Sequence, residues 1–183
     1  MKKIYFATTN EGKLKEAKAI LGIEIEGVGL ESVFEMQTLD PVTLTEHKAE
    51  QYFEYYKRPI IVEDTFLFID DMKGLPGPYY KDFLKTIGNE GILKFMQGEK
   101  NRGAKAQSTL VFKDQKGKPH VFIGEVKGKI TNKIKGEGFG WDPIFVPNGH
   151  SKTFGEMEME EKNKLSMRAK AFKKFKVWLD KQK

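Results

Sequence analysis

A strongly apolar run covers residues 60–69 and is interrupted only by Glu63, Asp64 and Thr65. Its β-branched and aromatic residues, with a proline before it and a glycine- and proline-rich turn after it, predict a buried strand. An ionised carboxylate in such a strand is costly unless it is paired or binds a ligand. The strand therefore either ends near solvent or holds a carboxylate that binds a metal or activates a water. Because successive strand residues face opposite sides of a sheet, Glu63 and Asp64 do not both point into one cavity.

The remaining hydrophobic pattern predicts a succession of short strands and helices. Strands are predicted at residues 3–8, 104–113 and 119–131, and residues 22–37 are predicted to be extended. The strands at residues 104–113 and 119–131 are expected to form a hairpin in a second lobe. Helices are predicted at residues 13–21, 43–57 and 89–96, from residue 78, and near the C-terminus. The pair Thr43 and Glu46 fits a capping box at the start of the second helix.

The opening strand, turn and helix form an arrangement that favours an anion. Thr8, Asn10 and Lys13 lie around the predicted start of the first helix. Free backbone N–H groups and the helix dipole stabilise a phosphate at such a position. The spacing of a Walker A loop is absent, so the same residues also fit an ordinary strand-to-helix turn.

A loop at residues 136–143 interleaves glycines with Phe139 and Trp141. Flexible glycines place exposed backbone beside aromatic faces, which gives a suitable surface for stacking a flat ligand. The alternative is a tight turn whose aromatic side chains belong to the core. The sequence leaves both interpretations open.

The chain of 183 residues is long enough for one domain or two closely packed lobes. It contains no cysteine, which excludes disulfides, thiolate zinc sites and a cysteine nucleophile. No apolar run reaches membrane-spanning length, and the first residues show no signal-peptide pattern. A cytoplasmic protein with no membrane partner is the simplest interpretation.

The net charge of +6 raises the question of a nucleic-acid partner. Residues 161–183 hold nine basic and two acidic residues, whereas residues 1–160 hold 23 and 24. The excess lies on a segment that predicts an amphipathic helix with a solvated lysine face. Its apolar stripe consists of Leu165, Ala169, Phe172, Phe175 and Leu179. Only three of the 32 basic residues are arginine, few for a protein that reads bases, so no nucleic-acid partner is expected.

Four separate segments, taken together and in order, resemble a single protein family. They are TTNEGK at residues 8–13, VEDT at 62–65 with GLPGPY at 74–79, GFGWDP at 138–143 and EKNKLSMR at 161–168. The chain is similar in these segments to the inosine triphosphate pyrophosphatases, also called XTP/dITP diphosphatases or non-standard purine NTP pyrophosphatases. The resemblance runs from residue 3 to residue 172.

The resemblance implies an elongated α/β fold in which helices flank a mixed central sheet. A single domain at residues 1–183 would have two lobes with an active-site cleft between them. The implied activity is a Mg²⁺-dependent hydrolysis of ITP, dITP or XTP to the nucleoside monophosphate and pyrophosphate. This reaction keeps deaminated purines out of nucleic-acid precursors. The implied assembly is a homodimer.

The resemblance also assigns roles to individual residues. Asp64 is the implied general base, and it binds the metal together with Glu35. Lys48, which by composition is an ordinary surface lysine, is implied to reach the phosphates. The implied triphosphate loop consists of Thr8, Thr9, Asn10, Glu11, Gly12 and Lys13. The other implied substrate contacts are Thr65, Phe139, Gly140, Trp141, Asp142, Lys162 and Arg168.

One position departs from the family pattern, which has Ser-His-Arg where this chain has Ser166, Met167 and Arg168. A thioether cannot donate a hydrogen bond as imidazole can, so base selectivity is expected to be weaker or differently built. The position could still touch the base through its backbone or by apolar contact. A pyrophosphatase of broader or different modified-nucleotide specificity is therefore the alternative function. A sensor that binds nucleotide without hydrolysis is disfavoured, because binding alone needs no general base.

Overall fold

The computed structural model describes residues 4–182 of the chain. Its strands are β1 (Ile4–Ala7), β2 (Ile25–Val28), β3 (Ile60–Ile69), β4 (Pro76–Gly77), β5 (Gly103–Lys113), β6 (Pro119–Ile130) and β7 (Phe145–Pro147). Its α-helices are α1 (Glu11–Leu21), α2 (Pro41–Tyr56), α3 (Tyr80–Thr86), α4 (Gly88–Phe95), α5 (Met159–Leu165) and α6 (Met167–Asp180). Two 3₁₀ turns, η1 (Asp142–Ile144) and η2 (Phe154–Glu156), complete the elements. The predicted strand at residues 60–69 is confirmed, whereas Lys3 of the predicted first strand lies outside the described residues.

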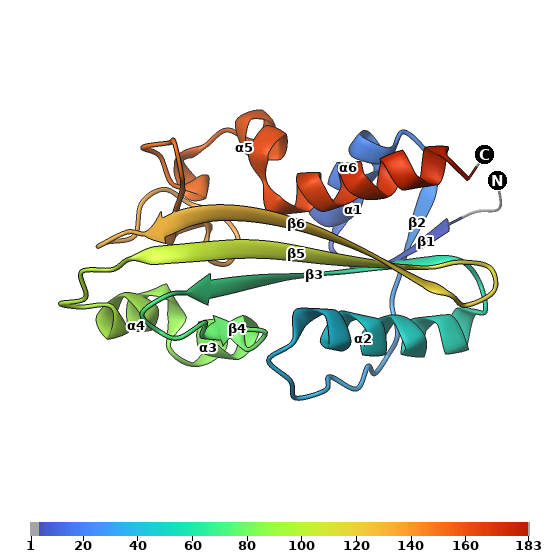
Figure 1. Cartoon of the computed structure of the whole chain (residues 1–183), viewed down its shortest axis with the longest axis horizontal. Helices are drawn as coiled ribbons and strands as arrows, with labels where there is room; N and C mark the ends of the chain where they lie inside the picture. Colours follow the sequence, from blue (N-terminus) through green and yellow to red (C-terminus); the bar gives the residue numbers. More distant parts are fainter. Residues whose placement is uncertain (1–3, 183) are drawn as a thin grey trace. The chain divides into compact units, whose positions relative to one another are not determined.

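The strands form one mixed sheet in the order β2-β1-β3-β5-β6-β7, with β4 paired to β3 (Figure 1). β1 is parallel to β2 and β3, whereas the pairs β3–β4 and β6–β7 are antiparallel. The predicted mixed α/β architecture is therefore confirmed. Among the helices of residues 4–182, none combines the length and apolar content needed to cross a membrane.

The chain divides into two compact units. Of the described residues, unit 1 contains 4–64, 108–124 and 168–182, and unit 2 contains 65–107 and 125–167. β3, β5 and β6 are long strands that contribute residues to both units. The hairpin turn between β5 and β6 belongs to unit 1, so the prediction that this hairpin lies in a second lobe is wrong for the end that carries the turn.

In unit 1, strand alternation separates two apolar clusters on opposite faces of the sheet. Ile60 and Val62 pack with residues of α2, whereas Ile61 between them packs with residues of α1 and α6. Figure 1 shows α2 along one face of β3, with α1 and α6 on the other. The next two residues of β3, Glu63 and Asp64, therefore face different helices.

The start of α2 differs from the sequence prediction. Asp40 is its N-cap and accepts hydrogen bonds from the N–H groups of Val42 at 3.1 Å and Thr43 at 3.3 Å. Pro41 occupies the first helical position, where its missing N–H is tolerated. The predicted capping box that starts at Thr43 is wrong because Asp40 caps the helix three residues earlier.

Two further predictions change at the ends of elements. Of the predicted extended residues 22–37, only β2 at residues 25–28 forms a strand. The predicted apolar stripe of the final helix loses its first member, because Leu165 lies at the end of α5 and α6 begins at Met167. The rest of the stripe is confirmed, because Ala169, Phe172, Phe175 and Leu179 all lie on α6 and are buried.

Candidate active site

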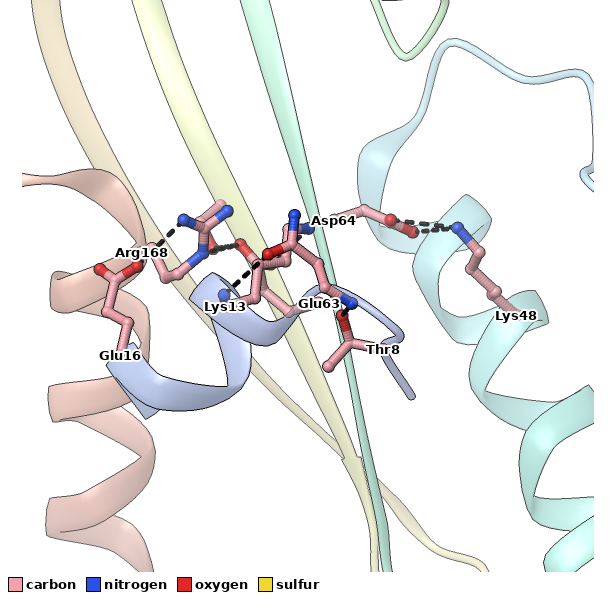
Figure 2. A network of polar contacts seen from close by, with 9 residues as sticks. Thr8, Lys13, Glu16, Lys48, Glu63, Asp64 and Arg168 are labelled. Carbon is pink, nitrogen blue, oxygen red and sulfur yellow. Dashed lines mark hydrogen bonds and ion pairs between the residues drawn. The ribbon is translucent and has the colours of Figure 1, made fainter. Parts of the chain in front are cut away.

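Glu63 is a buried acid at the centre of a polar network in unit 1 (Figure 2). Its side chain has no exposed surface, and its Oε2 lies 3.0 Å from Nζ of Lys13 on α1. Its Oε1 accepts a hydrogen bond at 2.7 Å from the Ser108 hydroxyl and one at 3.2 Å from Nε of Arg168. β3 continues beyond this point to Ile69. The interpretation in which the strand ends near solvent is therefore wrong.

The charges around Glu63 decide its ionisation. Burial by itself raises the pKa of this carboxyl, but Arg168 and Lys13 outweigh the burial and lower the pKa from 4.5 to about 2. Arg168 is in turn held by Glu16, whose Oε2 lies 3.1 Å from its Nη1. Burial lowers the pKa of Arg168, but the charges of Glu63 and Glu16 outweigh the burial and raise this pKa above its ordinary value. Glu63 and Arg168 are thus both charged at neutral pH.

Asp64 lies on the opposite face of β3 from Glu63 and meets α2. Both of its carboxylate oxygens accept hydrogen bonds at 3.0 Å from Nζ of Lys48 (Figure 2). Glu35 Oε1 lies 3.5 Å from the same ammonium group. Burial lowers the pKa of Lys48, but Asp64 and Glu35 raise it above 10.5 in total, so this lysine is charged at neutral pH. By composition Lys48 is an ordinary surface lysine, but its side chain is only 19% exposed.

Glu35 and Asp64 are the two acids that the resemblance implies as metal ligands. Among residues 4–182, no group of three Asp, Glu or His side chains is placed to hold a metal ion. The two carboxylates nevertheless converge on one cationic centre, the Lys48 ammonium. Mg²⁺ is commonly bound by one or two carboxylates together with waters and substrate phosphates. The donor set therefore fits a Mg²⁺ ion whose other ligands are waters or phosphate oxygens.

The turn before α1 is shaped by its own side chains. Asn10 is the N-cap, and its Oδ1 accepts a hydrogen bond at 3.0 Å from the N–H of Lys13. The Thr8 hydroxyl accepts one at 3.1 Å from the N–H of Asn10. Thr9, Asn10 and Glu11 are exposed. The turn thus combines the Asn-capped geometry of an ordinary helix start with an accessible surface at the positive end of the helix dipole.

The glycine-rich loop of unit 2 divides its two aromatic residues between core and solvent. Trp141 is buried and packs edge-on against Tyr80, with ring centroids 4.5 Å apart. Phe139 is 74% exposed. The core interpretation is therefore confirmed for Trp141, whereas Phe139 is an exposed ring for which stacking on a flat ligand stays a prediction.

A hydrogen-bonded chain fixes this loop from within unit 2. The Asn89 amide donates to the Gly140 carbonyl at 2.8 Å and accepts from the Tyr80 hydroxyl at 3.1 Å. Burial, and then the charge of Asp142, raise the pKa of Tyr80, so its hydroxyl keeps its proton and remains a donor. Gly140 adopts a left-handed conformation with φ of 66°, which favours glycine.

Asp142 and Lys162 form an ion pair beside the loop. The Asp142 carboxylate also accepts a hydrogen bond at 3.2 Å from the N–H of Phe139. Nζ of Lys162 lies 5.6 Å from the centre of the Phe154 ring. The structure therefore brings together the predicted residues Phe139, Asp142 and Lys162 within unit 2.

Met167 and Arg168 are neighbours in the chain but lie in different environments. The Met167 side chain is 4% exposed and belongs to the apolar core of unit 2. This position is therefore filled by core packing and leaves little surface for apolar contact with a base. Arg168 uses Nε and Nη1 to hold Glu63 and Glu16, so carboxylates fix its orientation.

Several residues that support the site were missed by sequence reasoning. They are Glu16, Ser108, Gln51 and Asn89. Glu16 carried a usable signal, because it follows Lys13 by three positions and thus shares its side of α1. The others contact residues that are distant in the chain, which no local pattern reports.

The fold and the site define a class: a mixed α/β protein in which lysines and an arginine are held by acids at the middle of a central strand. Residues 4–178 match the sequence model of the Ham1 family, and the chain belongs to this family. A relative from Methanopyrus kandleri, named dITP/XTP pyrophosphatase, is 45% identical over 180 residues, with 96% of this chain and 95% of the relative covered. A relative of the same name from Thermococcus kodakarensis is 40% identical, with 97% of each chain covered.

The fold is shared with solved structures of the same family. The structure of a HAM1 protein from Coxiella burnetii has a TM-score of 0.89, with 99% of this chain and 100% of that chain covered. Because the two sequences are only 23% identical, this comparison shows a shared fold and nothing more.

Proposed function

We propose that this Ham1-family enzyme hydrolyses deaminated purine nucleoside triphosphates, namely ITP, dITP and XTP, to the monophosphate and pyrophosphate. The observation that carries the proposal is the cluster of Asp64, Glu35 and Lys48, in which two carboxylates share one ammonium group. Relatives named dITP/XTP pyrophosphatase that are 40–45% identical over nearly the whole chain support the substrate class. The cluster supports hydrolysis, because a protein that only binds the nucleotide needs no general base such as Asp64.

Release of pyrophosphate requires cleavage of the α–β bridge, and the proposed step is attack of water at the α-phosphorus with pyrophosphate as the leaving group. In the proposed mechanism, Asp64 orients a water and accepts its proton, while Lys13, Lys48 and Lys162 neutralise phosphate charge. Glu35 and Asp64 would hold Mg²⁺, which supplies further charge neutralisation when it is bound. Lys48 is already charged and anchored, so it can exchange carboxylate oxygens for phosphate oxygens without changing its protonation state.

Base selectivity is proposed to depend on Arg168. Hypoxanthine and xanthine carry an acceptor oxygen at the 6-position, where adenine carries an amino donor. A guanidinium group offers only donors, so adenine would leave buried donors unpaired. Guanine also carries the 6-oxygen, and its exclusion is assigned to the loop at Trp141 and Asp142.

The test is to incubate the purified protein with Mg²⁺ and, separately, ITP, XTP, GTP and ATP, and to identify the products. Monophosphate and pyrophosphate from ITP and XTP, with GTP and ATP nearly untouched, would support the proposal. Pyrophosphate from all four would keep the chemistry and favour the alternative of broader specificity at the site where Met167 replaces histidine. Binding of ITP without turnover would leave a binding protein and make the role of Asp64 wrong. The homodimer and the cytoplasmic location stay predictions.

A further inference from the structure

The candidate metal ligand Glu35 lies in a segment without regular secondary structure. Residues 29–40 connect β2 to α2, and neither helix nor strand occurs within them. The Glu35 side chain is 51% exposed, whereas its partner Asp64 lies on a central strand and is 21% exposed. The backbone around Glu35 must therefore be held by side-chain contacts if its carboxylate is to stay beside Asp64.

Gln51 of α2 makes such contacts with the residue next to Glu35. Its Oε1 accepts a hydrogen bond at 2.7 Å from the N–H of Phe34, and its Nε2 donates one at 2.8 Å to the Phe34 carbonyl. The amide thus satisfies both backbone groups of one residue, as a neighbouring strand would. The amide nitrogen also lies 3.0 Å from Nδ1 of His47 and donates to the His47 carbonyl at 3.4 Å.

The position of Gln51 on α2 links this anchor to the acids. Gln51 follows Lys48 by three residues, so the two side chains lie on neighbouring positions of one helix face. Lys48 contacts the Glu35 carboxylate, and Gln51 holds the backbone of the preceding residue. Tyr56, five residues further along α2, donates a hydrogen bond at 2.6 Å to the Gly29 carbonyl at the start of the segment. One helix therefore holds the segment at Gly29, at Phe34 and at the Glu35 carboxylate.

We propose that Gln51 is a positioning residue that sets the affinity of the Glu35–Asp64 pair for a divalent cation by fixing the backbone at Phe34. The proposal rests on the proposed function in assigning a metal to these two acids. Because outer-shell partners commonly change metal affinity by about 10- to 100-fold, removal of the Gln51 amide should weaken metal binding by about 10-fold or more. A merely structural role for Gln51 would lower stability and leave metal affinity unchanged.

The experiment compares Gln51→Met, which keeps the length of the side chain and removes both hydrogen bonds, with wild type. Gln115→Met is the matched control, since Gln115 is an exposed residue of the hairpin turn in the same unit. Mn²⁺ alone is titrated and followed by electron paramagnetic resonance, without nucleotide. Amide hydrogen exchange of residues 29–40 is measured on the same proteins. A fourth and a fifth protein, Glu35→Gln and the double variant, complete a double-mutant cycle.

We expect Gln51→Met to raise the Mn²⁺ dissociation constant by about 10-fold and to speed exchange in residues 29–40, and Gln115→Met to change neither. In the Glu35→Gln background the Gln51 substitution should have no further effect on Mn²⁺ binding. Three outcomes would each overturn the proposal. The Mn²⁺ dissociation constant could be unchanged in Gln51→Met, or the Gln51 substitution could weaken Mn²⁺ binding equally in the Glu35→Gln background. The third outcome is that wild type binds no Mn²⁺. Products formed by wild type from ITP test the proposed function separately, so the two failures are distinguishable.

Discussion

Replacement of Glu63 by glutamine tests the buried network on which the site is built. The substitution keeps the size of the side chain but removes the negative charge between Lys13 and Arg168. The pKa of Glu63 falls from 4.5 to about 2, and one pKa unit corresponds to about 1.4 kcal/mol, so the ionised carboxylate contributes about 3 kcal/mol at neutral pH. Breaking a buried ion pair costs about 3–5 kcal/mol in general. The low end of this range is expected here, because Arg168 keeps its ion pair with Glu16 and because the Lys13 side chain is 19% exposed to water.

The assay is urea unfolding of wild type, Glu63→Gln and the control Glu31→Gln, an exposed acid of the same unit. The folded-state pKa is depressed, so the stabilisation is present above 4.5 and is lost as the pH falls toward about 2. The free energy of unfolding of Glu63→Gln should therefore lie about 3 kcal/mol below wild type at pH 7 and only about 1 kcal/mol below it at pH 3. Glu31→Gln should match wild type closely at every pH.

Two outcomes would refute this reasoning. Equal free energies of unfolding at pH 7 would show that the buried charge contributes nothing net to stability. A difference that stays constant between pH 7 and pH 3 would show that the loss comes from packing or from the Ser108 hydrogen bond and not from the ionisation of Glu63.

Two further substitutions test the catalytic and loop assignments. Asp64→Asn keeps the contact with Lys48 but removes the general base, so pyrophosphate release from ITP should fall by about 10²- to 10⁴-fold; near-full turnover, equal to that of an exposed-acid control such as Asp82→Asn, would contradict the assignment. Asn89→Ala removes the hydrogen bonds that fix Gly140 and Tyr80, so KM for ITP should rise by about 5- to 30-fold with a smaller change in kcat. The exposed Asn148→Ala is its control, and equal Michaelis constants for the two variants would contradict the role of Asn89.

Local sequence determined the elements whose signals are local. The apolar run at residues 60–69 forms β3 with the predicted bounds, because its β-branched and aromatic residues favour a pleated, buried strand. Period-two alternation also predicted that Glu63 and Asp64 face opposite sides, and the lysines of α1 and α2 meet them there. The cap of α2 was missed because Asp40 and Pro41 form a stronger start signal than the pair at Thr43.

The sequence pattern alone left Lys48 as a surface residue, and only the family resemblance marked it for the site. The tertiary structure gives the physical reason for its importance, since β3 places Asp64 against the face of α2 that carries Lys48. The same holds for Gln51 and Asn89, whose partners lie 17 and 51 positions away in the chain. Periodicity and capping report interactions within a few residues, whereas these contacts exist only after distant segments have packed. The sequence by itself determined which carboxylates and cations are present and which strand carries the acids, and the folded chain decided which cation pairs with which acid.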